Sequence, residues 1–272
     1  MENTLNSKKN RMLIQEIYAN RRLVWNLAKN DFKTRYSGSF LGMAWGFIQP
    51  VITVLVYWFV FTVAMGFDKI EGVPYALWLV SGLVPWFFFS DGLTGGTTSM
   101  LEYSYLVKKV VFNIDILPVV KVMAAVFTHI FFIIFTIIMF TVSGRPLNVH
   151  YLQIIYYSFC TFMFSLSLSY ITSSVVVFFR DLTQIVNIIL QIGVWITPIL
   201  WTMDIIHGNL VWFFYLNPVY YLVSGYRDSL ILNVSIISRW RMGLYFWAVT
   251  LVLMLVGRKL FSRLKVHFAD VL

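Results

Sequence analysis

Six long apolar runs dominate this chain and limit what it can fold into. They lie at roughly residues 40–65, 75–97, 119–142, 151–179, 183–203 and 242–261. A helix of about 20 apolar residues crosses the hydrocarbon core of a bilayer, and each run reaches that length. Hydrophobic residues make up 59% of the chain and charged residues 12%, which is far from the balance of a soluble domain. The sequence therefore predicts an all-α polytopic membrane protein with six transmembrane helices.

Positive charge is spread unevenly over the segments outside these runs. An even number of spans places both termini on one side, and sixteen of the 21 Lys and Arg residues then fall on that side. Because basic residues concentrate in cytoplasmic connections, this bias predicts cytoplasmic N and C termini. Membrane topology thus accounts for the net charge of +9, and we expect no nucleic-acid partner.

Residues 1–39 form a polar, basic region ahead of a transmembrane domain that we expect to cover residues 40–272. A long span without a signal-peptidase site follows, so the region is not a cleaved signal peptide. Over residues 11–35 the apolar side chains recur at helical spacing and most basic ones lie elsewhere. This pattern predicts an amphipathic helix in the cytoplasmic interface, and a disordered basic tail is the alternative.

Three glycines open the first span at a spacing of four residues: Gly38, Gly42 and Gly46. In a helix, this doubled G-x-x-x-G pattern puts the small residues on one face, where another helix can approach closely. The pattern leaves open whether the second helix belongs to the same chain or to another subunit.

The segment at residues 204–240 is apolar and aromatic but carries charges in its middle. Two full crossings and a turn need more than about 40 residues, so the segment is too short for a comfortable pair. We expect re-entrant half-helices that enter the outer leaflet before the last span. Because protein or water must cover irregular backbone at that depth, the segment indicates a cavity or exit path on the outer side.

A charged stretch, LVKKVVFNIDILP at residues 106–118, lies in the longest cytoplasmic connection, between the second and third spans. Its apolar residues follow helical spacing, which predicts a short amphipathic helix. The helix docks a soluble partner in one interpretation and rests on the membrane surface in the other. We expect its valines to seat the helix and its charged side chains to stay in water; these residues are Val107, Val110, Val111, Lys108, Lys109 and Asp115.

Few residues suggest metal, redox or phosphate chemistry. Cys160 is the single cysteine, and the four histidines, at positions 129, 150, 207 and 267, are too scattered to predict a metal site. The sequence has no G-x-x-x-x-G-K-S/T loop to hold nucleotide phosphates. Gly92, Gly95 and Gly96 lie within a span, where close helix packing is the simpler explanation.

Six stretches, in this order along the chain, resemble the ABC-2 type permeases that export lipid-linked polysaccharides. They are DFKTRYSGSFLGMAWGFIQP at 31–50, GLVPWFFFS at 82–90, LVKKVVFNIDILP at 106–118, VVVFFRDL at 175–182, WITPILW at 195–201 and YLNPVYYLVSGYRDSL at 215–230. The resemblance implies a homodimer of permease chains with two copies of a separate ABC ATPase, coupled through the helix at 106–118. ATP and Mg²⁺ would then bind to the ATPase, so we expect no cofactor and no catalytic residue in this chain.

The resemblance also implies a substrate, namely a glycan on an undecaprenyl diphosphate carrier. An O-antigen, a teichoic acid or a related cell-wall polysaccharide would cross the bacterial inner membrane from the cytoplasmic side. Aromatic side chains can pack their ring faces against the apolar side of pyranose rings. Trp and Tyr are also common at ordinary membrane interfaces, which is the alternative explanation. The candidates for an aromatic lining are Trp45, Phe47, Tyr57, Trp58, Trp195 and Trp201. The candidates for attracting the carrier headgroup, or equally other anionic lipids, are Lys29, Lys33 and Arg35.

Two alternatives to a permease subunit stay open from the sequence. A secondary transporter usually carries buried ionisable groups and inverted repeats, whereas Asp91 is the only acid well inside a predicted span. A membrane-embedded enzyme acting on lipid-linked glycans needs convergent carboxylates. The acids that would have to gather on the outer side are Asp68, Glu71, Asp204 and Asp228.

Overall fold

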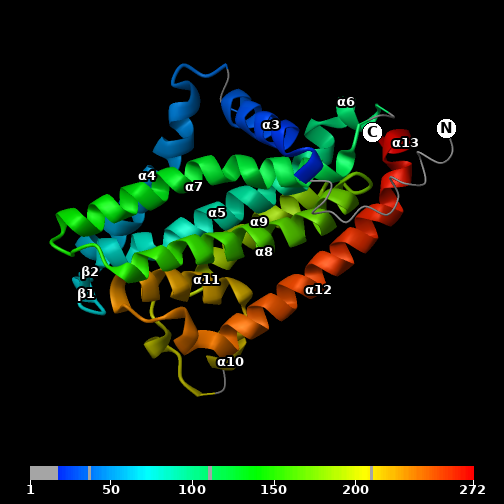
Figure 1. The fold of residues 1–272 in the computed structure, drawn as a ribbon. Coiled ribbons are helices and arrows are strands. Elements are labelled where there is room, and N and C mark those ends of the chain that lie inside the picture. Colours follow the sequence, from blue (N-terminus) through cyan, green and yellow to red (C-terminus); the bar gives the residue numbers. More distant parts are fainter. Residues whose placement is uncertain (1–17, 36–37, 110–111, 209–210) are drawn as a thin grey trace.

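The computed structural model describes residues 18–35, 38–109, 112–208 and 211–272, and it is almost entirely helical (Figure 1). Its α-helices are α3 (Arg21–Thr34), α4 (Trp45–Trp58), α5 (Tyr75–Glu102), α6 (Ser104–Val107), α7 (Leu117–Val142), α8 (Gln153–Val176), α9 (Leu182–Ile196), α10 (Val211–Tyr215), α11 (Pro218–Arg227), α12 (Trp240–Leu264) and α13 (Phe268–Val271). The strands β1 (Lys69–Ile70) and β2 (Val73–Pro74) form a small antiparallel hairpin. The predicted all-α fold class is confirmed.

Within the described residues, five helical segments are long and apolar enough to cross a membrane. They cover Gly42–Ala64, Tyr75–Glu102, Ile114–Val142, Val149–Val176 and Ile236–Val271, close to the first four predicted spans and the last. The fifth predicted span contains only α9, whose 15 residues rise about 22 Å, less than a hydrocarbon core about 30 Å thick. The number of complete crossings therefore stays a prediction.

α9 is short because the chain leaves the helix ahead of a proline. Thr197 precedes Pro198 and is extended, with φ of −74° and ψ of 133°, as expected for a residue before proline. Arg227 of α11 donates hydrogen bonds to the carbonyl oxygens of Pro198 (2.7 Å) and Ile199 (2.9 Å). These bonds satisfy backbone groups that lipid would leave without a partner, so the helix can end there.

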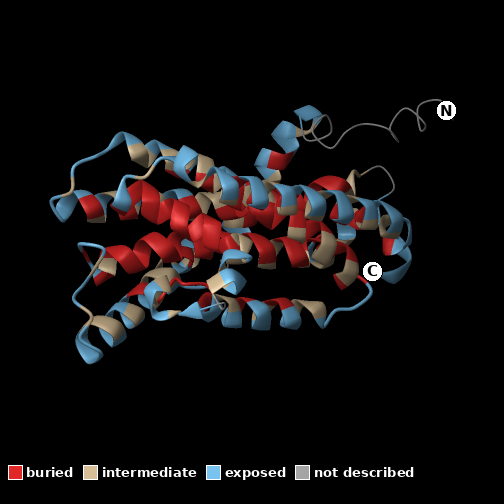
Figure 2. Cartoon of the chain, turned by 90° about the horizontal axis from the view of Figure 1, so that it is seen from below, coloured by how far each residue is buried: buried red, intermediate tan, exposed pale blue. Residues whose placement is uncertain are grey.

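α5 is the central helix of the bundle. Of the 18 residues in its most apolar stretch, 78% are buried. In the corresponding stretch of the first span, which contains α4, only 6% are buried. α7 and α8 pack along α5, and α12 packs on α8 (Figure 1). The buried residues concentrate along the middle of the bundle (Figure 2). A Cβ added to Gly96 of α5 would lie 2.0 Å from Oγ of Ser169 in α8. Close helix packing at this glycine is therefore found within one chain.

The glycines that open the first span do not form a helical stripe. Gly38 and Gly42 precede α4 and have φ of +103° and +51°. No described atom, other than those of their chain neighbours, lies within 4 Å of a Cβ added to either residue, and only Gly46 lies in α4. The predicted helical face of small residues is wrong here, because the first two glycines adopt left-handed conformations instead. A contact of this segment with another subunit stays a prediction.

In the described part of the segment at 204–240, the α-helices α10 and α11 lie below the bundle in Figure 1. A π-helical turn at Asp228–Leu232 continues α11, and a 3-10 turn at Ile236–Arg239 leads into α12. Asn217 caps α11, since its Oδ1 accepts from the backbone N–H of Val219 (3.0 Å). Asp228, which is 1% exposed, then forms an ion pair with Arg239 just before α12. Both helices are too short to cross a bilayer, and their depth in a membrane stays a prediction.

The connection between the second and third spans holds less helix than its spacing predicts. α6 covers only Ser104–Val107, and a 3-10 turn at Ile114–Ile116 leads into α7. Asn113 begins that turn by accepting a hydrogen bond from the backbone N–H of Asp115 (3.2 Å). The expectation of one helix across this stretch is wrong, because the capped turn starts a separate element. Two of the predicted seating residues, Val110 and Val111, lie outside the described residues.

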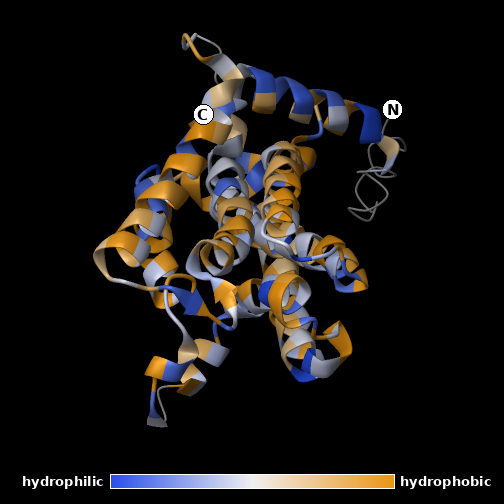
Figure 3. Ribbon diagram, turned by 90° about the vertical axis from the view of Figure 1, so that its left-hand side faces the viewer, coloured by the Kyte–Doolittle hydropathy of each residue, from blue (hydrophilic) through white to orange (hydrophobic). Residues whose placement is uncertain are grey.

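α3, α6 and α13 lie toward one end of the bundle, called here the terminal end, and the β-hairpin lies toward the other, the hairpin end (Figure 1). α3 runs across the bundle and is mainly hydrophilic (Figure 3). Its buried residues are Val24, Ala28 and Asp31, on one face. An amphipathic helix is therefore confirmed over Arg21–Thr34, whereas residues 11–17 of the predicted helix lie outside the described part.

Candidate functional site

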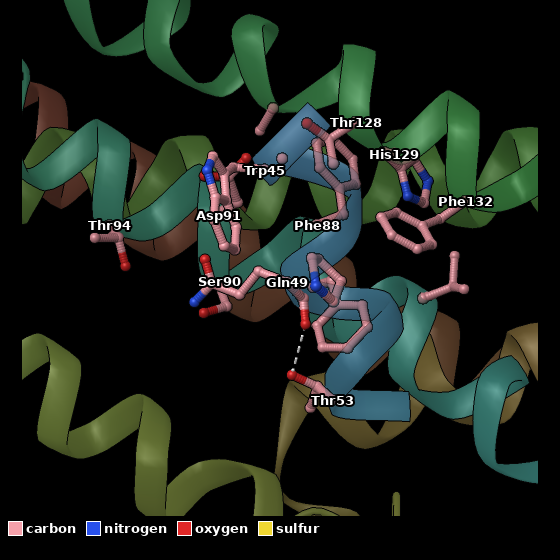
Figure 4. Close-up of a pocket in the computed structure, with 15 residues that line it drawn as sticks. Trp45, Gln49, Thr53, Phe88, Ser90, Asp91, Thr94, Thr128, His129 and Phe132 are labelled. Carbon is pink, nitrogen blue, oxygen red and sulfur yellow. Dashed lines mark hydrogen bonds between the residues drawn. The ribbon is translucent and has the colours of Figure 1, made fainter. Parts of the chain in front are cut away.

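A cavity of about 290 Å³ lies between α4, α5 and α7 (Figure 4). Aromatic rings of Trp45 and Phe88 form part of its wall. Polar side chains also line it, although all three helices are strongly apolar; these are Gln49, Thr53, Ser90, Asp91, Thr94, Thr128 and His129. Polar groups at membrane depth are costly and usually serve a path or a pair. We therefore take this α4–α5–α7 cavity as the candidate functional site.

Asp91 connects the cavity to α3. One of its carboxylate oxygens lies 2.5 Å from a guanidinium nitrogen of Arg35, the residue that follows α3. The two side chains are 32% and 22% exposed, so the pair is partly shielded from solvent. Part of the charge of Arg35, one of the three predicted headgroup residues, is thus balanced inside the chain. Lys29 and Lys33, the other two, are exposed on α3.

His129 of α7 lies in the cavity wall and is 3% exposed. Its ring stacks on Phe88 with 4.2 Å between the centroids. Its Nε2 lies 2.9 Å from both Oγ of Ser158 and the hydroxyl of Tyr226. The histidine therefore ties α7 to α5, α8 and α11, and the sequence pattern had assigned it no role.

A second polar cluster, called here the α3 anchor, consists of Asp31, Glu102, Tyr103 and Lys121. The ammonium nitrogen of Lys121 lies 2.5 Å from Oδ1 of Asp31 and 2.5 Å from Oε2 of Glu102. The side chains of Asp31 and Lys121 are only 7% and 4% exposed. Since a buried charge is stable only when paired, this cluster fixes α3 against α5 and α7.

Tyr103 completes the α3 anchor and extends it toward α6. Its hydroxyl donates to Oδ1 of Asp31 at 2.9 Å. Burial raises the pKa of Tyr103, and the negative charge of Asp31 raises it further. The hydroxyl therefore keeps its proton and remains a donor at neutral pH. Because Tyr103 immediately precedes α6, the anchor links α3 to the loop that was expected to couple to a partner.

The described residues of that loop divide into a buried and an exposed set. Val107 is 7% exposed, whereas Lys108 and Lys109 are exposed. Asp115 is 8% exposed, and its carboxylate lies 2.7 Å from the ammonium nitrogen of Lys265. The expectation that Asp115 stays in water is wrong, because a residue 150 positions away pairs with it.

The six aromatic candidates do not share one surface. Tyr57 and Trp195 meet edge to face with centroids 6.3 Å apart, and the indole of Trp201 donates to the carbonyl oxygen of Trp195 at 2.8 Å. Trp45 lines the α4–α5–α7 cavity, and Trp58 is 38% exposed.

Phe47, the sixth aromatic candidate, lies elsewhere and packs against Phe131 and Phe32, with centroids 4.4 and 6.2 Å apart. It therefore joins α4 to α7 and α3. Three of the six, Tyr57, Trp195 and Trp201, form a connected group.

A cavity of about 270 Å³, called here the hairpin-end cavity, gathers charged residues at the opposite end from the α3 anchor. Three of the four acids considered on the sequence line it, namely Glu71, Asp204 and Asp228, and Asp68 does not. Arg227 also lines it and stacks on Trp78, with its guanidinium carbon 3.5 Å from the ring centroid. Among the described residues, no group of three or more His, Cys, Asp and Glu side chains is placed to hold a metal ion.

Sequence reasoning missed Lys121, His129 and Arg227. Lys121 and His129 are ionisable residues within one predicted apolar span, and Arg227 lies in an otherwise apolar stretch. An ionisable residue at such a position is by default paired or functional. That signal was available in the sequence, but the partners come from distant segments and only the fold reveals them.

Comparison with known proteins identifies the family of this chain. Residues 22–231 match the ABC-2 type transporter family. The O-antigen export system permease protein RfbA of Klebsiella pneumoniae is 28% identical over 247 residues, which cover 90% of this chain and 93% of that protein. The protein of the same name from Myxococcus xanthus is 30% identical over 217 residues, covering 79% of this chain and 82% of its own. This multi-pass membrane chain therefore belongs to the ABC-2 type transporter family.

Proposed function

We propose that this chain is the permease subunit of an ATP-driven exporter that moves O-antigen or a related polysaccharide, linked to undecaprenyl diphosphate, across the bacterial inner membrane. The observation that carries the proposal is the match to two O-antigen export permeases over most of each chain. A polar cavity among apolar helices supports it, since a hydroxyl-rich glycan loses its hydrogen bonds in hydrocarbon and needs such groups on its path.

An ABC-2 permease works with an ABC ATPase. Because the sequence has no phosphate-binding loop, ATP and Mg²⁺ belong on that second polypeptide, in two copies per exporter in our proposal. Lys108 and Lys109 are exposed next to α6, and Val107, the last residue of α6, is buried. This arrangement suits a loop that is seated on its own bundle and presents basic side chains to the ATPase.

The working unit is a homodimer in this proposal. α4 and α9 leave wide apolar surfaces uncovered, and only 6% of the most apolar window of the first span is buried. A second copy would cover these surfaces and close a path between the two chains. The connected rings of Tyr57, Trp195 and Trp201 join α4 to α9, so they are our first candidates for lining that path.

The terminal end faces the cytoplasm in this proposal, which follows the bias of basic residues along the sequence. Lys29 and Lys33 are then exposed on α3, where they can attract the carrier diphosphate or other anionic lipids. Arg35 contributes less, because Asp91 already pairs with it.

Reconstitution tests the proposal directly. The full chain and its ATPase are placed in liposomes that carry a radiolabelled lipid-linked glycan, and exposure of the glycan on the opposite leaflet is followed with an impermeant glycosidase. Added ATP should expose the glycan, and an ATPase variant that cannot hydrolyse ATP should not.

Two results would favour the alternatives. Movement driven by a proton gradient without the ATPase would indicate a secondary transporter. Chemical change of the glycan without movement would indicate an enzyme.

A further inference from the structure

The turn that leads into α7 holds a buried carboxylate whose partner comes from the far end of the chain. Asp115 lies in this 3-10 turn, Ile114–Ile116, and its side chain is 11% exposed. Its carboxylate lies 2.7 Å from the ammonium nitrogen of Lys265, the residue that follows α12. A carboxylate at this depth is costly without a positive partner. The pair therefore fixes the turn against the C-terminus of α12.

The backbone of the same turn is held by two further contacts. The hydroxyl of Tyr170 in α8 donates to the carbonyl oxygen of Asp115 at 2.8 Å. Oδ1 of Asn113 accepts from the N–H of Asp115 at 3.2 Å. Asp115 is therefore a fixed point at one end of the connection between α5 and α7. This connection is called here the coupling loop, because it carries the proposed ATPase contacts, Lys108 and Lys109.

The chain on either side of that ammonium group is itself anchored. Phe261 of α12 and Phe268 of α13 are 1% and 0% exposed, and their ring centroids are 5.5 Å apart. Phe261 also meets the ring of Tyr170 edge to face, with centroids 5.5 Å apart. Both phenylalanines belong to the same apolar cluster as Val107 of α6 and Ile116 of the turn. The ammonium group is thus held on a buried support that the coupling loop shares.

We infer that Lys265 is a positioning residue for the coupling loop. Through Asp115 it fixes the end of the loop, while the buried Val107 fixes its beginning. Lys108 and Lys109 lie between these two points. Force that an ATPase applies to them then passes into α8 and α12, because packed contacts transmit displacement that a free loop would absorb. The inference rests on the proposed function, since that function supplies the ATPase.

Hydrogen–deuterium exchange on the full chain in detergent, without the ATPase, tests the contact itself. Lys265→Met removes the charge and keeps most of the side-chain length. Peptides covering residues 112–117 should exchange about fivefold faster than in the wild type, which is the upper end for a partly exposed ion pair. Lys265→Arg keeps the charge and should keep the protection. Lys259→Met, at an exposed site on α12, is the matched control and should leave exchange in this turn unchanged.

The liposome assay with the ATPase tests the positioning role. The number of glycans exposed per ATP hydrolysed should fall about fivefold in Lys265→Met and recover in Lys265→Arg. Misfolding lowers both quantities together, because fewer complexes work, and so leaves this ratio unchanged.

Three results would overturn the inference: wild-type exchange in Lys265→Met, faster exchange with an unchanged ratio, or a lowered ratio that Lys265→Arg does not restore. Failure of the wild type to expose glycan with ATP would refute the proposed function and the coupling role with it. The exchange experiment would then still decide whether Lys265 holds the loop.

Discussion

Replacing Lys121 by methionine should release α3 from the bundle. The change removes the ammonium group that lies 2.5 Å from Oδ1 of Asp31. The side chain of Asp31 is only 7% exposed, so water cannot readily replace the lost partner. Removing one member of a buried ion pair costs about 3–5 kcal/mol, because the remaining charge has lost its partner. Here Asp31 keeps two weaker contacts, since Tyr103 still donates to it and a guanidinium nitrogen of Arg35 lies 3.7 Å from its Oδ2. Glu102 is 52% exposed and can turn to water. We therefore expect the lower end of that range, about 3 kcal/mol.

That loss should appear as local unfolding of α3, since the anchor fixes this helix to α5 and α7. A cost of 3 kcal/mol raises the population of the open form on the order of a hundredfold. Lys29 and Lys33 are exposed trypsin sites on α3, but the protease needs the helix to open. Limited digestion of the detergent-purified chain, followed by mass spectrometry, should show cleavage after Lys29 accelerating by a similar factor.

A double-mutant cycle separates this electrostatic effect from general damage. Asp31→Asn added to Lys121→Met removes the carboxylate that only the more distant Arg35 would still balance, so the double variant should be cleaved more slowly than Lys121→Met alone. Lys259→Met, at an exposed site on α12, serves as the control and should not change cleavage in α3. Wild-type digestion of the Lys121 variant would refute the anchor, and so would a double variant cleaved faster than the single one.

Three further predictions concern helix packing, the end of α9 and the coupling loop. Gly96→Ala should lower the melting temperature in detergent by overpacking α5 against Ser169, at a cost of about 1–3 kcal/mol. Arg227→Met should destabilise the chain by about 2–4 kcal/mol, because two carbonyl oxygens lose their donors; thermal unfolding measures this too. Lys108→Glu with Lys109→Glu should reduce co-purification of the ATPase at an unchanged melting temperature, because both side chains are exposed.

Each of these has a matched control within the chain. For Gly96 it is Gly95→Ala, where the added Cβ would meet its nearest neighbour at 3.6 Å and packing should tolerate it. For Arg227 it is Arg241→Met at an exposed position, and for the lysines it is Lys259→Glu. A variant that behaves like its control would contradict the corresponding prediction.

The sequence predicted the long helices well because length and hydropathy alone decide them. The first span was expected at residues 40–65 and is found at Gly42–Ala64. The fifth apolar run was expected to reach residue 203, whereas α9 ends at Ile196, beside carbonyl oxygens that Arg227 of a later helix binds. The helical face predicted at Gly38 and Gly42 is wrong, because four-residue spacing does not reveal whether the backbone is helical there.

The candidate site was less accessible to sequence reasoning, since its polar groups meet through tertiary contacts. Lys121 lies within the third predicted span, and its partner Asp31 is 90 positions away. Asp115 was expected in water, but it is buried and its carboxylate pairs with the ammonium group of Lys265. Pairings of this range leave no periodic signal in the sequence, so only the residue types were predictable.

The two polar clusters at opposite ends of the molecule share one helix. α5 supplies Glu102 to the α3 anchor and Trp78 to the hairpin-end cavity, and Asp91 to the cavity between them. Its 28 residues span about 42 Å, and its apolar window is the most buried of the five. Because closely packed interiors have low compressibility, a helix packed this tightly transmits strain along its length. Movement that an ATPase imposes near α6 would therefore reach the hairpin-end cavity through α5, and in the proposed homodimer the exposed face of α4 would carry it to the second copy.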